Sequence, residues 1–382
     1  MPKTYPLSGY GSMLADEGRI NAYAQAIRQT VKPGSVVIEL GTATGLMAFL
    51  ACQAGARKVF ALDPSDTIVI AQQIARDNGL ADRVEFLPVM STAFTPAERA
   101  DVLIFDLRGT TTCFEHNLPS IADARERLLK PNGTLICQRD TLNVCVVEDA
   151  GLHRKLVGVW EDTRWGVDLR AALAYGPHQF TRVRFKAEEM LCAAQVWATV
   201  HYPTVVSPHV HGAASLEITR AGTGHALGMW FDAELAGGAR VSNAPTEPDH
   251  VWSRQILGWP RAVALLPGDR VDVKLSAVFS EGDYIWNWAT HISRDGKVLD
   301  EFKQSTLQGR IQTLEGHTRK LGSYQPKPNP SLAIEKYLLE RVNGVATQGE
   351  LAAQIRAQFP RRFGSVEGAL AFVAKVTERY GL

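Results

Sequence analysis

Continuous apolar runs typical of buried strands alternate with helical hydrophobic periods along residues 33–147. The β-branched run "SVVIEL" (35–40) ends in the glycine turn "GTATG", which predicts a strand followed by a tight turn. The next stretch, "LMAFLACQAGA" (46–56), predicts a helix, and "KVFALDPS" (58–65) predicts a second buried strand. Strand, glycine turn, helix and strand form one βαβ unit, whose crossover is right-handed in nearly all proteins.

The same alternation continues through this region. Apolar runs predict strands at 84–89, 100–107 and 133–139, and helical periods occupy 67–80 and 122–129. This alternation predicts a doubly wound parallel sheet, a Rossmann-like domain over residues 33–147. Ahead of it, apolar residues at helical spacing over residues 13–31 predict one amphipathic helix within an amino-terminal helical segment, residues 1–32.

The pattern changes after residue 147. Short apolar runs separated by turn residues, with few helical periods, predict an antiparallel β-barrel or sandwich domain over residues 148–321. The Pro-rich stretch 322–332 predicts a linker, because Pro continues neither a helix nor a strand. Five tryptophans of the antiparallel region are expected in its core or at its rim: Trp197, Trp230, Trp252, Trp286 and Trp288.

Residues 333–382 predict a small helical module. Thr347 and Glu350 have the spacing of a capping box and precede Leu351 and Ile355 at helical spacing. A second amphipathic helix begins near Val366.

Composition limits the classes of function. Lys and Arg number 41 against 40 Asp and Glu, so no overall charge favours a nucleic acid or an anionic membrane as partner. The five cysteines are scattered without a CxxC pair, and "HVH" (209–211) has no evident third ligand, so neither a disulfide framework nor a metal site is predicted. Neither a long apolar segment nor the apolar core of a signal peptide is present, and we expect a soluble cytoplasmic protein.

The turn after the first strand is the first candidate for chemistry. Glycine lets a backbone approach a ligand closely, and Asp63 ends the next strand about 20 residues on, where a carboxylate can bind ribose hydroxyls. A dinucleotide fingerprint requires glycines where Ala43 and Leu46 stand. The pattern therefore favours an adenosine ligand without a pyrophosphate.

These residues resemble a known family. "VVIELGTATGLMAFLACQAGARKVFALDPS" looks like the first motif of class I S-adenosylmethionine-dependent methyltransferases, and "AGARKVFALDPS" is similar to the protein arginine methyltransferase branch. "YGSMLADEGRINAY" resembles the helix of that branch that covers the cofactor, and "FDLRGTTTCFEHNL" the hairpin with its two catalytic glutamates. "WEDTRWGVDL", "HALGMWFDAEL" and "PDHVWSRQILGWP" resemble its β-barrel domain.

The resemblance implies S-adenosylmethionine as cofactor and S-adenosylhomocysteine as product. Arg19 would pair with the cofactor's carboxylate, Glu39 would lie beside its amino group, and Asp63 would hold the ribose. The full set of implied cofactor residues is Met13, Arg19, Glu39, Gly41, Thr42, Gly45, Asp63, Pro64, Met90 and Ser91.

The resemblance also implies catalytic residues and shows departures from the family. Glu115 and Asp106 would hold a substrate guanidinium between two carboxylates, although Asp106 is one methylene shorter than the family's glutamate. Arg108 stands where the family has Met. In the barrel loop Val251 holds the family's histidine position, and His250 stands beside it. The candidate catalytic residues are therefore Glu115, Asp106, Arg108 and His250.

Three hypotheses remain open. In the first, the protein methylates a guanidino nitrogen of a peptide or arginine-like molecule, with Glu115 and Asp106 as the clamp. In the second, Arg108 binds an acidic group and the methyl acceptor is a different nucleophile in a ribosomal peptide or metabolite. In the third, the protein is a non-catalytic module that binds the cofactor or a peptide.

Two further expectations concern partners. The family commonly dimerises through an arm, which implies a homodimer through residues 173–190. The module at 333–382 resembles winged-helix, peptide-recognising domains related to the coenzyme PQQ synthesis D protein. A packing or dimerisation appendage is the alternative for this module.

Overall fold

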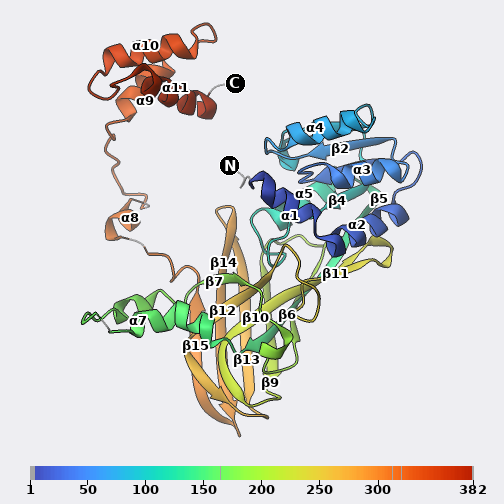
Figure 1. Cartoon of the computed structure of the whole chain (residues 1–382), viewed down its shortest axis with the longest axis vertical. Coiled ribbons are helices and arrows are strands. Elements are labelled where there is room, and N and C mark those ends of the chain that lie inside the picture. Colours follow the sequence, from blue (N-terminus) through green and yellow to red (C-terminus); the bar gives the residue numbers. More distant parts are fainter. Residues whose placement is uncertain (1–4, 164, 312, 320, 381–382) are drawn as a thin grey trace. The chain divides into compact units, whose positions relative to one another are not determined.

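The structure is a computed structural model that describes residues 5–163, 165–311, 313–319 and 321–380. The chain divides into two compact units, Met1–Ile311 and Gln312–Leu382. The first unit contains a parallel sheet and two antiparallel sheets, and the second contains helices (Figure 1). The predicted fold class is thus confirmed in its parallel, antiparallel and helical parts.

The first sheet has five parallel strands in the order β3-β2-β1-β4-β5. Its strands and helices are β1 (Val36–Leu40), α3 (Leu46–Gln53), β2 (Lys58–Leu62), α4 (Ile68–Asp77), β3 (Val84–Leu87), β4 (Ala100–Phe105), α5 (Asn117–Arg127) and β5 (Leu129–Leu135). All residues of β1 are buried, as expected for a central strand covered on both faces. The strand order reverses between β1 and β4, and ligands of such sheets bind at the carboxyl ends of the strands beside that point.

The amino-terminal helix differs from its prediction. Instead of one helix over residues 13–31 there are two, α1 (Leu7–Leu14) and α2 (Glu17–Thr30). Asp16 causes the break, because its side chain accepts a hydrogen bond from the backbone N–H of Arg19 and so begins a new helix.

The end of the parallel sheet also differs. Strand β6 (Cys137–Val147), expected in the parallel sheet, pairs with strands of the antiparallel domain. Only Ile136 separates β5 from β6, so the apolar run is continuous although the chain passes from one sheet to another. The parallel sheet therefore ends at Leu135 rather than near residue 147.

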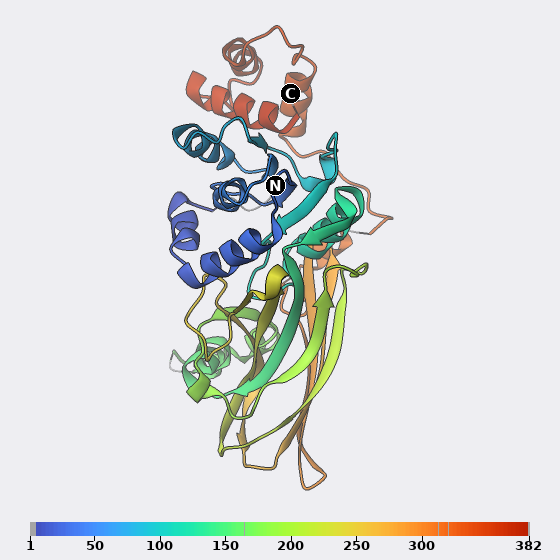
Figure 2. The same ribbon diagram turned by 90° about the vertical axis from the view of Figure 1, so that its right-hand side faces the viewer.

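The antiparallel part consists of two sheets. One has the order β7-β12-β10-β6-β8, with β11 paired to β10, and the other has the order β15-β14-β13-β9. Figure 2 shows these long strands below the parallel sheet. Their bounds are β7 (Phe180–Val183), β8 (Gln195–His201), β9 (Val210–Glu217), β10 (Gly222–Leu235), β11 (Arg240–Ser242), β12 (Arg254–Leu265), β13 (Arg270–Ser280), β14 (Asp283–Arg294) and β15 (Lys297–Ser305).

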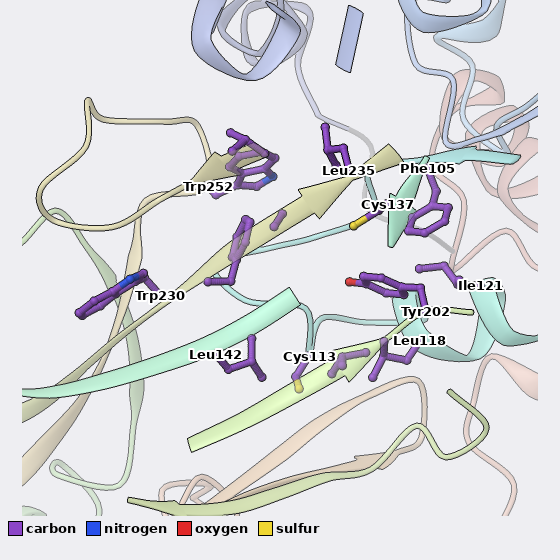
Figure 3. Close-up of a cluster of buried hydrophobic side chains, with 14 of the residues drawn as sticks. Phe105, Cys113, Leu118, Ile121, Cys137, Leu142, Tyr202, Trp230, Leu235 and Trp252 are labelled. Carbon is purple, nitrogen blue, oxygen red and sulfur yellow. The ribbon is translucent and has the colours of Figure 1, made fainter. Parts of the chain in front are cut away.

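One continuous apolar core joins the parallel and antiparallel parts. It runs from Phe105, at the end of β4, to Leu142 in β6 and Trp230 in β10, and Figure 3 shows these side chains in one cluster with Tyr202. The five tryptophans expected in the core or at the rim, Trp197, Trp230, Trp252, Trp286 and Trp288, are all buried, which confirms their expected structural role. The two parts of the first unit are therefore packed as one body, so residues from both can form one site.

A short helical segment projects beside the antiparallel sheets (Figure 1). It contains α6 (Ala150–His153), the π-helix η2 (Arg154–Gly158), α7 (Val159–Glu161) and the 3₁₀ helix η3 (Arg170–Ala174). The expected arm, residues 173–190, overlaps it only in part, because Phe180–Val183 forms β7 and pairs with β12.

The second unit has a small core of its own. Its helices are α8 (Leu314–Thr318), α9 (Leu332–Leu339), α10 (Gln348–Gln358) and α11 (Val366–Tyr380). Leu338, Leu351 and Val373 are buried together, and Thr347 and Glu350 form the predicted capping box. Residues 313–319 and 321–380 contain no strand, so the described part of the module lacks a β-wing.

Across all described residues, none of the helices combines the length and apolar character required to span a bilayer.

Candidate active site

The glycine turn after β1 is held against the end of β2. Gly41, Ala43 and Gly45 all have left-handed backbones, with φ of 72°, 48° and 87°. The backbone N–H of Ala43 donates to Oδ2 of Asp63 at 2.8 Å. Glycine suits position 41 because its backbone is left-handed, and an added Cβ would lie 2.6 Å from Cδ2 of Leu107, which would have to move.

Glu39 is a buried carboxylate beneath this turn. It is 4% exposed and accepts a hydrogen bond from the Thr42 hydroxyl at 2.6 Å. Burial raises the pKa of Glu39 to about 8, and the nearby charge of Asp63 adds to the effect. Such a carboxyl group gains stability from a cationic partner, because a positive charge favours its ionised form.

Other expected cofactor residues lie along the same edge of the sheet. Asp63 follows β2, and Met90 precedes the 3₁₀ helix η1 (Ser91–Ala93) after β3. Pro64 is exposed beside them, whereas Ser91 is buried. The hydroxyl of Ser65 and Nε of Arg19 are buried without a protein partner, so this edge retains polar atoms for a ligand. The donor and acceptor set fits a ligand with ribose hydroxyls, an ammonium and a carboxylate.

The start of α2 contacts the loop after β4. Nη1 of Arg19 donates to Oδ2 of Asp106 at 2.6 Å, and Nη2 donates to the backbone oxygen of Met13 at 2.9 Å. Both side chains of the ion pair are 9% exposed. Three predicted site residues, Met13, Arg19 and Asp106, are therefore brought into direct contact.

Arg108 lies inside the protein. Its side chain is 1% exposed, and Nε and Nη2 donate to the two carboxylate oxygens of Asp140 at 2.7 and 2.9 Å. Nη1 donates to the Tyr23 hydroxyl at 2.7 Å and to Oδ1 of Asp106 at 3.1 Å, and Nη2 also contacts Sγ of Cys137. Burial alone would lower the pKa of Arg108, but Asp140 raises it, so this group remains a cation. The N–H donors of the Arg108 side chain are therefore bonded to other protein groups. Arg108 has no donor left to anchor an acidic group of a substrate.

Asp140 and Tyr202 were not singled out by the sequence. Asp140 is fully buried in β6 and accepts a further hydrogen bond from the Tyr202 hydroxyl at 2.6 Å. The Thr112 hydroxyl lies 2.5 Å from the same phenol oxygen and donates to it. Asp140 stands among Gln138, Arg139 and Thr141, and such a polar stretch carries no local signal that one carboxylate is buried.

Glu115 lies at the far end of the same loop. It is half-buried and has a left-handed backbone with φ of 40°, a conformation that is uncommon for residues other than glycine. The loop is folded back on itself, because a Cβ added at Gly109 would lie 2.6 Å from the Phe114 ring. The end that carries Glu115 is held by Asn117, whose side-chain amide donates to the backbone oxygen of Thr112 at 2.7 Å.

His250 contacts the start of α2. Its Nδ1 lies 2.7 Å from Oδ1 of Asp16, while the backbone N–H of Val251 donates to Oδ2 of Asp16 at 2.9 Å. Burial raises the pKa of Asp16, but hydrogen bonds from Val251, His250 and Arg19 hold it below its usual range. His250 thus reaches the site through the helix that carries Arg19.

Metal ligation finds no support in the described part of the chain. His209 and His211 have ring centroids 6.5 Å apart. Among the described residues, no three His, Cys, Asp or Glu side chains are grouped as metal ligands.

Comparisons with known proteins agree with this geometry. Residues 22–138 match the family model of ribosomal protein L11 methyltransferase (PrmA). The chain is 27% identical over 237 residues to the probable protein arginine N-methyltransferase 6 of Arabidopsis thaliana, which covers 59% of this chain and 54% of that relative. The chain therefore spans about half the length of that plant protein.

A bacterial relative and a solved structure extend the match. The arginine N(omega)-methyltransferase of Streptomyces achromogenes subsp. streptozoticus is 27% identical over 271 residues, which covers 69% of this chain and 74% of that protein. The Trypanosoma brucei PRMT1 enzyme-prozyme heterotetrameric complex with AdoHcy has a TM-score of 0.71 at 20% identity, covering 78% of this chain and 96% of that one. The comparisons confirm the expected resemblance: the chain is similar to the protein arginine methyltransferases in sequence and in fold.

Proposed function

We propose that the protein transfers a methyl group from S-adenosylmethionine to a guanidino nitrogen of an arginine-containing peptide or a small arginine-like molecule. The observation that carries the proposal is the meeting of Arg19 and Asp106, at 2.6 Å, beside the point where the parallel strand order reverses. This contact joins the proposed cofactor residues to the proposed acceptor residues. The arginine methyltransferase names of two relatives support the same acceptor chemistry.

The cofactor supplies an electrophilic methyl group when it is bound. Arg19 would hold its carboxylate, Glu39 its ammonium and Asp63 its ribose hydroxyls, as guanidinium and carboxylate groups favour such charge-assisted contacts. Gly41, Thr42 and Gly45 would form the turn beneath it, with Met13 over it. Pro64, Met90 and Ser91 would complete the adenine side.

The acceptor has to be oriented first, and the nitrogen that receives the methyl group then loses one proton to solvent. A guanidinium stays protonated and its lone pairs are delocalised, so carboxylates that fix its plane and localise its charge favour attack by one nitrogen. We assign this role to Glu115 together with Oδ2 of Asp106. Oδ1 of Asp106 accepts from the buried Arg108 and Oδ2 accepts from Arg19, so Oδ2 reaches the acceptor when the cofactor's carboxylate takes Arg19. We assign His250 an indirect role, through Asp16 and α2.

The alternative in which Arg108 anchors an acidic substrate group loses its support. The guanidinium of Arg108 is buried and paired with Asp140. A different nucleophile would therefore have to be recognised by other residues, and no contact of Arg108 favours one.

Partners and location complete the proposal. We propose a homodimer in which the projecting helical segment, from α6 to η3, packs on a second copy, because it exposes the apolar side chains Val159, Trp160, Trp165, Val167 and Leu169. We propose that the carboxyl-terminal module binds the peptide acceptor. Five free, buried cysteine thiols fit a reducing, cytoplasmic compartment.

A transfer assay with isotopically labelled S-adenosylmethionine tests the function. The acceptors are an arginine-containing peptide, the same peptide with Lys in place of Arg, and free arginine. Mass spectrometry should locate the label on a guanidino nitrogen and find none on the Lys peptide. Label on another functional group, or on none of the acceptors, would contradict the proposed reaction.

A further inference from the structure

The contacts of Asp106 divide its two oxygens between two arginines. Oδ1 accepts from Nη1 of Arg108 at 3.1 Å, and Oδ2 accepts from Nη1 of Arg19 at 2.6 Å. Arg19 lies on α2 with its Nε unpartnered, so it has a remaining donor for a ligand. The side chain of Arg108 is 1% exposed, so a ligand cannot reach it and replace its protein partners.

The position of Arg108 is set by the antiparallel part of the protein. Its fork donates to both oxygens of Asp140, a residue of β6, and this planar two-point pairing fixes the orientation of the guanidinium. The face of the guanidinium also lies 5.2 Å from the centroid of Phe231, in β10. The third nitrogen, Nη1, is thereby pointed at Asp106, in the loop after β4.

The two arginines and two aspartates of this cluster have no net charge. Arg19 and Arg108 contribute two positive charges, and Asp106 and Asp140 contribute two negative charges. Asp140 is fully buried, and Arg108 is the cation that neutralises it. Removing Arg108 alone would leave a buried carboxylate unpaired, which is strongly destabilising.

We propose that Arg108 is a positioning residue for methyl transfer: held by Asp140, it keeps Oδ1 of Asp106 engaged, so that Oδ2, which pairs with Arg19, is the oxygen that turns to an acceptor once a ligand carboxylate takes Arg19. This inference rests on the proposed function and deepens it. The acceptor is then oriented by one oxygen of Asp106 and by Glu115. A purely structural bridge between the two parts of the unit is the competing account of Arg108.

The informative variant removes both buried charges. In Arg108→Met/Asp140→Leu no carboxylate is left unpaired, so the fold is expected to survive. The two phenols keep partners, because the Tyr23 hydroxyl still donates to the backbone oxygen of Phe105 and the Tyr202 hydroxyl still contacts Thr112. Arg294→Met/Asp269→Leu is a matched control, since Arg294 and Asp269 form a similar two-point pair at 2.7 Å in the antiparallel domain.

The measurements are kcat for an arginine-containing peptide, affinity for S-adenosylhomocysteine, and thermal unfolding. In Arg108→Met/Asp140→Leu we expect kcat to fall about a hundredfold while cofactor affinity is kept, because a misplaced orienting group mainly affects the reaction step. The control variant should keep the wild-type kcat. In an Asp106→Asn background the double substitution should lower kcat little further, since the group that it positions is already altered.

The outcomes separate the two proposals. A folded double variant with the wild-type kcat overturns the positioning role while the methyltransferase function stands. Wild-type protein that transfers no methyl group to any guanidino acceptor overturns the function and the inference with it. If the double variant unfolds, Arg108→Lys decides: lysine keeps the charge but lacks the fork, so kcat should fall, and an unchanged kcat rejects the positioning role.

Discussion

Arg19 and Asp106 stand 87 positions apart in the chain and form a 2.6 Å ion pair at the end of the parallel sheet. Arg19 comes from the helix that the resemblance assigns to the cofactor, and Asp106 comes from the hairpin that it assigns to the acceptor. One pair thus connects the two halves of the proposed reaction. It also means that a ligand carboxylate competes with Asp106 for Arg19.

Replacing Arg19 should weaken cofactor binding. Arg19→Ala removes the cation proposed for the cofactor's carboxylate, so affinity for S-adenosylhomocysteine should fall about ten- to hundredfold in a calorimetric titration. Arg28→Ala is the matched control, because Arg28 is exposed on the same helix. Equal affinities of the two variants would remove Arg19 from the cofactor site.

Replacing Glu115 should slow transfer without affecting the cofactor. Glu115→Gln keeps the shape of the side chain but removes the charge that orients a guanidinium, so kcat should fall about a hundredfold. Glu126→Gln, an exposed position on the following helix α5, should retain the wild-type rate. A wild-type rate in Glu115→Gln would exclude this carboxylate from the mechanism.

The contact between Asp16 and His250 should contribute to stability. The two carboxylate oxygens of Asp16 form hydrogen bonds with the His250 ring and the Val251 backbone N–H. Asp16→Asn replaces one of these oxygens by an NH₂ group, so the free energy of unfolding should fall by about 1–3 kcal/mol at neutral pH. The pKa of Asp16 is lowered in the folded protein, so this contribution is present above the usual carboxyl pKa and is lost as pH falls through the lowered value. Chemical unfolding of Glu17→Gln, at an exposed neighbouring position, provides the control. Equal losses in both variants would contradict the assigned role.

Glu39 should make stability depend on pH. Its pKa is about 8 in the folded protein, against a usual value of 4.5, so between these values the folded state holds a proton that the unfolded chain releases. The free energy of unfolding therefore falls as pH rises through this window, by about 1.4 kcal/mol per pH unit from this group alone. Glu39→Gln removes the effect, and its stability relative to the wild type should rise from pH 5 to about pH 8. Parallel pH profiles for the variant and the wild type would contradict the buried, protonated state.

Local patterns predicted the glycine turn and the strand that precedes Asp63. The turn from Gly41 to Gly45 and the acid at Asp63 lie within one βαβ unit, so their relative positions follow from sequence spacing. The strand change at β6 was missed, because one residue separates β5 from β6 and the apolar run does not mark a change of sheet.

Long-range partners could not be predicted in the same way. Arg108, in the loop after β4, and Asp140, in β6, are 32 positions apart, so only the packed structure pairs them. The same is true of Asp16 and His250, which are 234 positions apart. For this reason the sequence left Arg108 as a possible substrate anchor, whereas the structure gives it a buried partner.

A crystal structure of the wild-type protein with S-adenosylhomocysteine tests the central claim most directly. We expect the ligand over the turn from Gly41 to Gly45, with Asp63 bound to its ribose hydroxyls and its carboxylate within hydrogen-bonding distance of Arg19. A ligand bound elsewhere, or protein side chains filling the space over that turn at saturating ligand, would contradict the account.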